Sequence, residues 1–80
     1  MRKRVLLPDA AREIRLAKAE SDPAFRLGQF ATRCLMSSAH LCNVEAGRKG
    51  ATEEVIHRIA AHLGVPISAI SYEVPLEAAS

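Results

Sequence analysis

The sequence contains no tryptophan, one tyrosine, two phenylalanines and two cysteines among its 80 residues. A hydrophobic core must therefore be mainly aliphatic, drawn from the 49% of residues that are hydrophobic. Two cysteines are too few for the disulfide framework of a small secreted domain, and the spacing of Cys34 and Cys42 matches no common zinc motif. No apolar run approaches the roughly 20 residues of a membrane-spanning helix. We therefore expect a cytoplasmic protein with reduced cysteines, no membrane segment, no metal and no cofactor.

A chain of this length forms one domain and buries only about 60 to 65% of the surface of its unfolded state. Catalytic patterns are missing too, since the sequence has no Ser-His-Asp order, paired-carboxylate arrangement or glycine-rich phosphate loop. We therefore expect that the protein is not an enzyme.

Charge is distributed unevenly along the chain. Residues 1–50 carry ten Lys or Arg against five Asp or Glu, whereas residues 51–80 carry one against four. A basic first half suggests one surface suited to a polyanion. The overall net charge of +2 is nevertheless modest for a nucleic-acid-binding protein.

Apolar residues recur at helical spacing through most of the chain and predict an all-α domain over residues 8–72. Before it we expect a flexible basic arm over residues 1–7, and after it a loose C-terminal tail over residues 73–80. Ser37 and Thr52 have side chains suited to cap helices. The five expected helices cover approximately residues 8–20, 25–34, 37–46, 53–63 and 67–72.

The second and third of these helices are joined by only a few residues, which is the arrangement of a helix-turn-helix. The segment from Phe30 to Arg48 has an ordered pattern of small, apolar and polar positions, with Ala31 where the two helices cross and Gly47 after the second. This pattern resembles the helix-turn-helix of the lambda repressor-like (Xre and Cro type) regulators. The similarity extends over most of the chain, including Arg58 to Val65.

The resemblance implies a compact five-helix lambda repressor-like DNA-binding domain whose third helix enters the major groove. Carried over by position, the DNA base contacts fall on Ser38, Ala39, Cys42 and Asn43. Asn43 suits this role because an asparagine can pair with adenine through two hydrogen bonds. The expected contacts to the DNA backbone are Arg2, Lys3, Arg4, Arg26, Gln29, Arg33, Ser37, His40, Arg48 and Lys49.

The function implied is that of a bacterial or phage transcriptional regulator that binds double-stranded DNA in a sequence-specific way. It would act most simply as a repressor that occupies a pseudo-palindromic operator as a symmetric homodimer. The end of the chain offers an apolar set that could form the dimer surface, so replacing Val74 and Leu76 by Asp should weaken self-association. That set comprises Ile67, Ile70, Tyr72, Val74 and Leu76.

The sequence departs from the family pattern at three places. Leu27 replaces the usual glutamine at the start of the second helix, and the loop around residues 22–23 is about two residues longer than usual. Leu35 replaces the usual turn glycine, at a cost of about 1 kcal/mol if the backbone there has a positive φ.

Two alternative functions stay open. One is an antitoxin that binds its own operator and also a partner protein through the acidic second half. The other is a protein-interaction adaptor that has lost DNA binding, an alternative suggested by Leu27, Leu35 and the lack of arginine in the third helix.

Several other residues have simpler interpretations. Cys34 is expected in the core, and Cys42 on the DNA-facing surface is the better candidate for redox chemistry. Glu45 and Lys18 occupy positions that often form an ion pair in the family, joining the first and third helices. His57 and His62 are five residues apart and do not align on a helix as metal ligands would.

Overall fold

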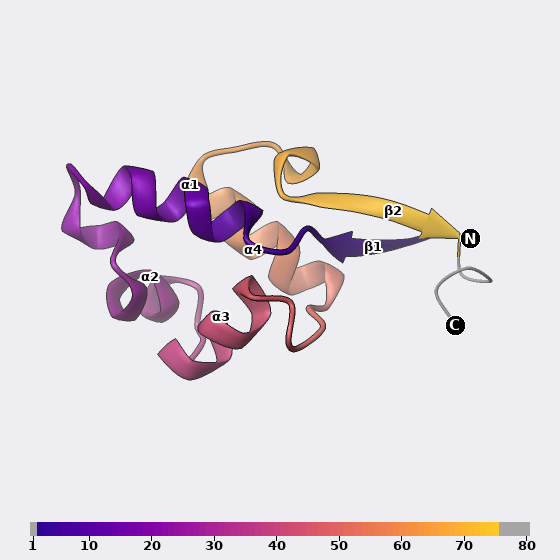
Figure 1. The fold of residues 1–80 in the computed structure, drawn as a ribbon, viewed down its shortest axis with the longest axis horizontal. Helices are drawn as coiled ribbons and strands as arrows, with labels where there is room; N and C mark the ends of the chain where they lie inside the picture. Colours follow the sequence, from indigo (N-terminus) through magenta and orange to yellow (C-terminus); the bar gives the residue numbers. More distant parts are fainter. Residues whose placement is uncertain (1, 76–80) are drawn as a thin grey trace.

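The computed structural model describes residues 2–75, with Arg2 described only through its backbone. Over this range the chain forms four α-helices and one two-stranded antiparallel sheet (Figure 1). Two short 3-10 turns, Pro23–Phe25 and Ile67–Ala69, precede α2 and β2. The elements are β1 (Arg2–Leu6), α1 (Ala10–Ala19), α2 (Leu27–Arg33), α3 (Ser38–Glu45), α4 (Glu53–Leu63) and β2 (Ser71–Pro75).

The expectation of a five-helix all-α domain is therefore wrong, because helices and a sheet occur together. In place of the fifth helix, the chain makes only the Ile67–Ala69 turn and then enters β2. Tyr72 and Val74 are residue types that favour strands, and they lie on the same side of β2. A strand also needs a partner, and the partner lies at the other end of the sequence.

That partner is β1, which occupies the segment expected to be a mobile arm. The two strands pair with Val5 opposite Tyr72 and Lys3 opposite Val74. Arg4 ties them further, since its guanidinium donates to Ser71 Oγ at 3.0 Å and to a Glu73 carboxylate oxygen at 2.8 Å. The expected tail likewise belongs to β2 as far as residue 75, and its residues 76–80 lie outside the described range.

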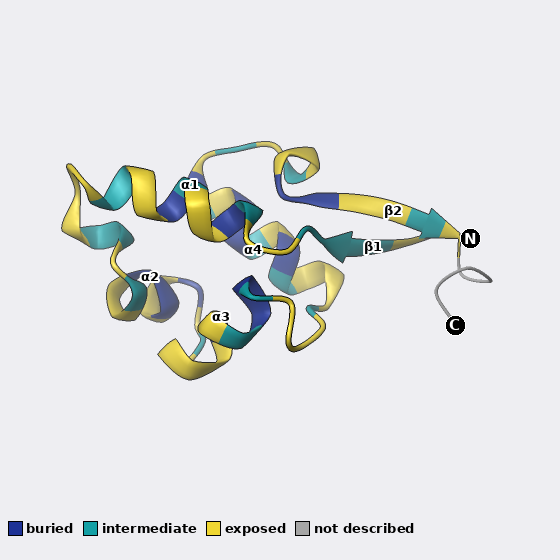
Figure 2. Ribbon diagram, viewed as in Figure 1, coloured by how far each residue is buried: buried dark blue, intermediate teal, exposed yellow. Residues whose placement is uncertain are grey.

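The core lies among the four helices, as the buried positions in Figure 2 show. The aliphatic core expected from the composition is confirmed, with Phe30 as its one fully buried aromatic side chain. Cys34 is also fully buried, as expected, and Ala31 supplies the small side chain on α2. The buried hydrophobic residues are Ala11, Phe30, Ala31, Cys34, Leu41, Val44, Ile56, Ile59, Ala60, Leu63 and Ile70.

Capping residues define where α3 and α4 begin, as expected. Ser37 Oγ accepts a hydrogen bond from the His40 amide at 3.1 Å, and Thr52 Oγ1 accepts one from the Val55 amide at 3.2 Å. Each cap satisfies a backbone donor that has no partner within its own helix. α4 then ends at Gly64, whose φ of 72° suits a residue without a β-carbon.

Leu35, in the connection between α2 and α3, adopts a φ of 61°. Its side chain is 79% exposed and therefore contributes little packing. Leu35→Gly should raise the free energy of unfolding by about 1 kcal/mol because glycine relieves the left-handed strain. Urea denaturation would measure this. Leu35→Ala is the control, because it removes the same side chain and keeps the strain; equal stability of the two variants would refute the explanation.

Candidate nucleic-acid interface

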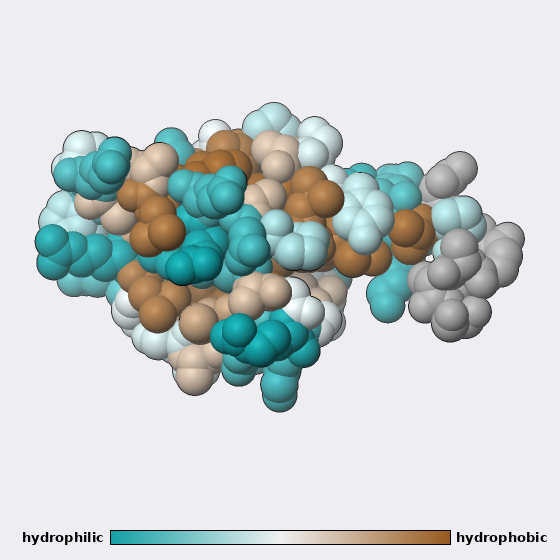
Figure 3. Space-filling view, viewed as in Figure 1, coloured by the Kyte–Doolittle hydropathy of each residue, from teal (hydrophilic) through white to brown (hydrophobic). Residues whose placement is uncertain are grey.

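α3 packs against the body on one side and is open on the other. Its inner side is buried through Leu41, Val44 and Glu45. A β-carbon added to Gly28 would lie 3.7 Å from Ser38 Oγ, so the start of α2 closely approaches the start of α3. In Figure 3, strongly hydrophilic side chains gather near the loop that follows α3, whereas the surface where α3 begins is pale to tan. The exposed residues of α3 are Ser38, Ala39, His40 and Cys42.

A buried ion pair fixes α3 to α1. Arg15 Nε donates to Glu45 Oε2 at 2.8 Å and Nη2 donates to Oε1 at 3.1 Å, while the residues are only 4% and 2% exposed. The remaining nitrogen, Nη1, donates to the Phe25 carbonyl at 3.0 Å. The backbone adds another link, from the Asp9 amide to the Glu45 carbonyl at 2.8 Å. The end of α3 is therefore attached both to α1 and to the residue before it, and the Phe25 carbonyl helps to hold the Arg15 side chain in place.

The expected partner of Glu45 was Lys18, and the structure corrects this. The Lys18 ammonium instead lies 5.7 Å from the centre of the Phe25 ring. Arg15 is the better partner for a buried carboxylate because its planar guanidinium makes two parallel hydrogen bonds and leaves a donor for a third group.

Removing the Glu45 carboxylate should lower the free energy of unfolding substantially. Glu45→Leu leaves the Arg15 charge buried without its partner, so we expect a loss of about 3 to 5 kcal/mol in the free energy of unfolding. Replacing both residues, with Arg15→Met and Glu45→Leu, should cost less, since no charge is left buried. Glu54→Gln is the control, because it breaks the solvent-exposed pair with Arg58 and should cost under about 1 kcal/mol. Chemical denaturation measures all three; a Glu45→Leu loss no larger than the control would contradict the assigned role.

Among the four expected base contacts, Ser38, Ala39 and Cys42 are exposed and Asn43 is half-buried. Asn43 is not isolated, because its Oδ1 accepts a hydrogen bond from Arg48 Nε at 2.9 Å. Arg48 Nη2 also lies 3.7 Å from Cys42 Sγ. The guanidinium is therefore held against the same side of α3 that carries the candidate base contacts.

Arg48 was expected to contact only the DNA backbone, and its place beside Asn43 was missed. The chain turns back after α3 at Gly47, whose φ is 80°, and the Arg48 amide donates to the Asn43 carbonyl at 2.9 Å. In the sequence, Gly47 indicates where the helix ends, but it does not indicate the direction in which the Arg48 side chain points.

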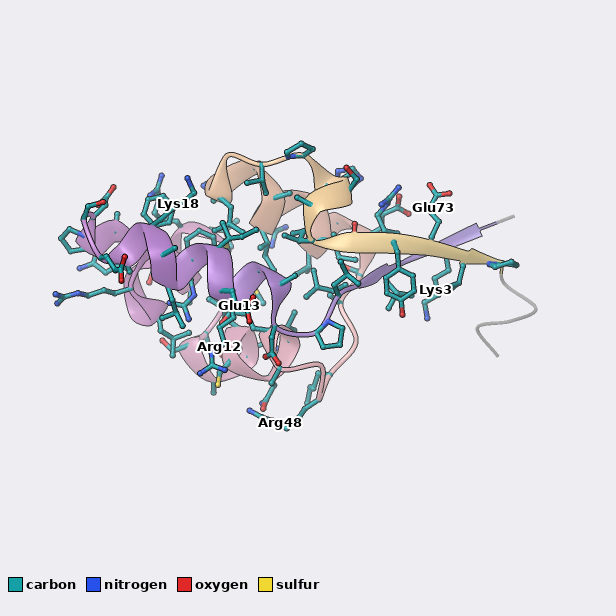
Figure 4. All side chains as sticks on the ribbon, turned by 45° about the horizontal axis from the view of Figure 1, so that its top comes forward. Lys3, Arg12, Glu13, Lys18, Arg48 and Glu73 are labelled. Atoms are coloured by element: carbon teal, nitrogen blue, oxygen red, sulfur yellow. The ribbon has the colours of Figure 1, made fainter. Side chains whose placement is uncertain are left out.

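A second missed residue is Arg12 on α1. It lines a groove of about 300 Å³ between α1 and α3 together with Leu27, Cys42 and Arg48. Figure 4 shows Arg12 and Arg48 on the same side of the molecule, whereas Lys18 lies toward the other end of α1. Arg12 makes only a loose contact with Asp9, at 3.9 Å. No local pattern in the sequence indicates that α1 places a cation beside α3.

The residues expected to contact the DNA backbone differ in whether their side chains already have partners within the protein. Ser37 already uses its hydroxyl as the α3 cap, and the Arg4 side chain, 17% exposed, is held by Ser71 and Glu73. Lys3 and Lys49 are exposed and line the same groove, of about 210 Å³, between β1 and the loop after α3. The side chain of Arg2 lies outside the described part of the chain. The other exposed candidates are Arg26, Gln29, Arg33, His40 and Arg48.

The two cysteines have contrasting environments. Burial raises the pKa of the Cys34 thiol above its usual value, an effect that Arg58 and Arg33 partly offset. Only a thiolate reacts rapidly with alkylating reagents, so at neutral pH Cys34 should stay unmodified in the folded protein while the exposed Cys42 is modified.

Mass spectrometry after brief alkylation would check this, with Cys42→Ser as the control that should lose the fast-reacting site. Rapid modification of Cys34 in the folded control would contradict the burial described.

No family model, curated protein or solved structure matches this chain. Within residues 2–75, no helix has both the length and the apolar character needed to cross a membrane.

Proposed function

We propose that the protein is a sequence-specific double-stranded DNA-binding transcriptional regulator, acting as a repressor by operator occupancy with α3 in the major groove. The observation that carries this proposal is the hydrogen-bonded pair formed by Asn43 and Arg48 on the accessible side of α3. Both side chains are suited to base edges, since asparagine pairs with adenine and arginine with guanine through two hydrogen bonds each.

The rest of α3 is consistent with close approach to a groove. Ser38 and Ala39 are small and exposed at its beginning, where they would let the backbone come near the base edges. A serine hydroxyl can donate or accept a hydrogen bond there, and the alanine methyl can contact a thymine methyl. The Arg15–Glu45 pair supports the geometry by holding the helix in one orientation.

Cations flank this surface on two sides. Arg12 lies across the groove between α1 and α3, and Lys49 follows Arg48 in the loop. Lys3 shares a second groove with Lys49 and extends the basic surface onto β1. Such cations would bind phosphates and set affinity, whereas base contacts would set sequence preference.

Selection of bound sequences from a random duplex library at near-physiological salt tests the proposal. We expect one enriched motif, and we expect Asn43→Ala to weaken binding to it by about 1 to 3 kcal/mol while relaxing the preference at one base pair. Lys49→Ala is the control, because loss of a phosphate contact should weaken binding to all sequences alike. A folded protein that enriches no sequence would contradict the proposal and favour the interaction adaptor.

Arg12→Gln tests the cation that the structure adds to the interface. If Arg12 binds a phosphate, the slope of log affinity against log salt concentration should fall by about one. Lys18→Gln removes the same charge from the other end of α1 and should leave that slope nearly unchanged. Fluorescence anisotropy over a salt series measures both slopes. Equal slopes for the two variants would contradict the assignment of Arg12 as a phosphate contact.

A further inference from the structure

The groove of about 210 Å³ between β1 and the loop after α3 lies apart from the groove between α1 and α3, with no lining residue in common. A β-carbon added to Gly47 would lie 3.6 Å from the Pro8 side chain, so the loop packs closely against the chain that follows β1. The apolar side chains that line the groove are Val5, Leu6, Pro8, Val44, Ala51 and Tyr72.

The strand register explains how the sheet contributes to this groove. Val5 lies directly opposite Tyr72, so their side chains share one face of the sheet, and Lys3 lies on the same face because side chains alternate along β1. Tyr72 is 44% exposed and Val5 is half-buried. The protein therefore leaves an aromatic ring and a neighbouring aliphatic side chain incompletely covered, and a flat apolar ring can pack against such a pair.

The charges around the groove are all positive. Lys3 and Lys49 line it, both are exposed, and neither forms a salt bridge with a described residue. Arg4 also lines it but is held by Glu73. No described residue that lines the groove is acidic. In Figure 4 the Lys3 side chain extends from β1 toward the side of the molecule on which Arg48 lies. The groove is therefore complementary in charge to an anion.

We propose that this groove is a binding site for a small aromatic carboxylate. The ring packs against Tyr72 and Val5, and Lys3 and Lys49 bind the carboxylate. Such a division between an apolar wall and a few polar groups that fix orientation is typical of small-molecule sites. The volume is below the range of about 300 to 1,000 Å³ in which drug-sized ligands bind, so the site fits a single ring with a short acidic substituent.

A regulatory role follows for this ligand, and that role rests on the proposed function. Lys3 and Lys49 are also the cations proposed to bind DNA phosphates on this side of the molecule. A carboxylate bound to them would neutralise part of that charge and compete with the phosphates, so the ligand would release the protein from DNA. Binding of the carboxylate is measured without DNA, so the ligand site and the DNA-binding function can fail independently.

This site gives Tyr72 a role different from the one expected from the sequence, which places it in an apolar dimer surface. Ile70, expected in the same surface, is fully buried in the core and is not available to a partner. Leu76 lies outside the described residues. Tyr72 instead lines the groove beside Lys3.

Phenylacetate is the probe for the first experiment, because it joins one ring to one carboxylate. During titration of the isotopically labelled native chain at constant ionic strength, it should shift the backbone amide signals of Val5, Tyr72 and residues 49–51. We expect a dissociation constant of about 1 mM, within reach of a ligand with about ten non-hydrogen atoms. Phenylacetamide has the same ring without the charge and should bind at least about fivefold more weakly. No shifts around the groove, or equal binding of the amide, overturns the proposal.

A pair of variants tests the ring contact. Tyr72→Ala should raise the dissociation constant of phenylacetate by at least about fivefold, because it removes the aromatic wall. Leu16→Ala is the matched control, since it removes an apolar side chain of similar exposure, 45%, from α1 and should leave binding unchanged. Circular dichroism establishes that both variants fold, and the comparison of phenylacetate with phenylacetamide on the native chain decides the matter if Tyr72→Ala does not. A folded Tyr72→Ala that binds phenylacetate as the native chain does overturns the proposal.

Fluorescence anisotropy with duplex DNA tests the regulatory role separately. At a saturating concentration and constant ionic strength, phenylacetate should weaken DNA binding by the native chain about fivefold, whereas phenylacetamide should not. Phenylacetate that occupies the groove and leaves DNA affinity unchanged overturns the regulatory role. A chain that binds phenylacetate but no DNA contradicts the proposed function and supports the ligand site.

Discussion

The buried pair between Arg15 and Glu45 is the interaction on which the candidate interface depends. α3 has only eight residues, too few for a helix to be stable by itself in water, so its position must come from tertiary contacts. Leu41 and Val44 attach its inner side to the core, but apolar contacts alone have little directionality. The bidentate ion pair, with its third bond to the Phe25 carbonyl, supplies a fixed direction. The cost of burying both charges is offset only because these hydrogen bonds are all made.

The outer side of α3 derives its character from neighbouring segments as much as from its own sequence. Gly47 turns the chain so that Arg48 meets Asn43, and α1 brings Arg12 to the same groove. The helix itself contributes small and neutral side chains. The candidate interface therefore combines small side chains from α3 with positive charge from α1 and from the loop after α3. The Arg15–Glu45 pair holds α1 and α3 together.

Local signals in the sequence were sufficient for α2, α3 and α4. The caps at Ser37 and Thr52, the glycine at Gly64 and the apolar spacing all depend on residues within a few positions of one another. The strained Leu35 was also identified as a position at risk if φ were positive, and its φ is 61°.

The sheet and the interface cations could not be found in that way. β1 and β2 stand at opposite ends of the chain, and five-residue segments carry too little alternation to reveal a strand without its partner. The choice of Arg15 over Lys18 depends on the direction in which α1 crosses α3. Likewise, the sequence alone predicts only that Arg48 is an exposed cation. Its contact with Asn43 depends on the direction of the turn at Gly47.

The most direct test of the account is to follow the backbone amide signals of isotopically labelled protein during titration with duplex DNA at near-physiological salt. If α3 is the surface that meets DNA, the largest shifts occur in α3, in the loop through Lys49 and at Arg12, while signals of α4 near Glu54 stay almost unchanged. Shifts centred on α4 with α3 unaffected, or no shifts at all from folded protein, would contradict the claim that α3 is the surface that meets DNA.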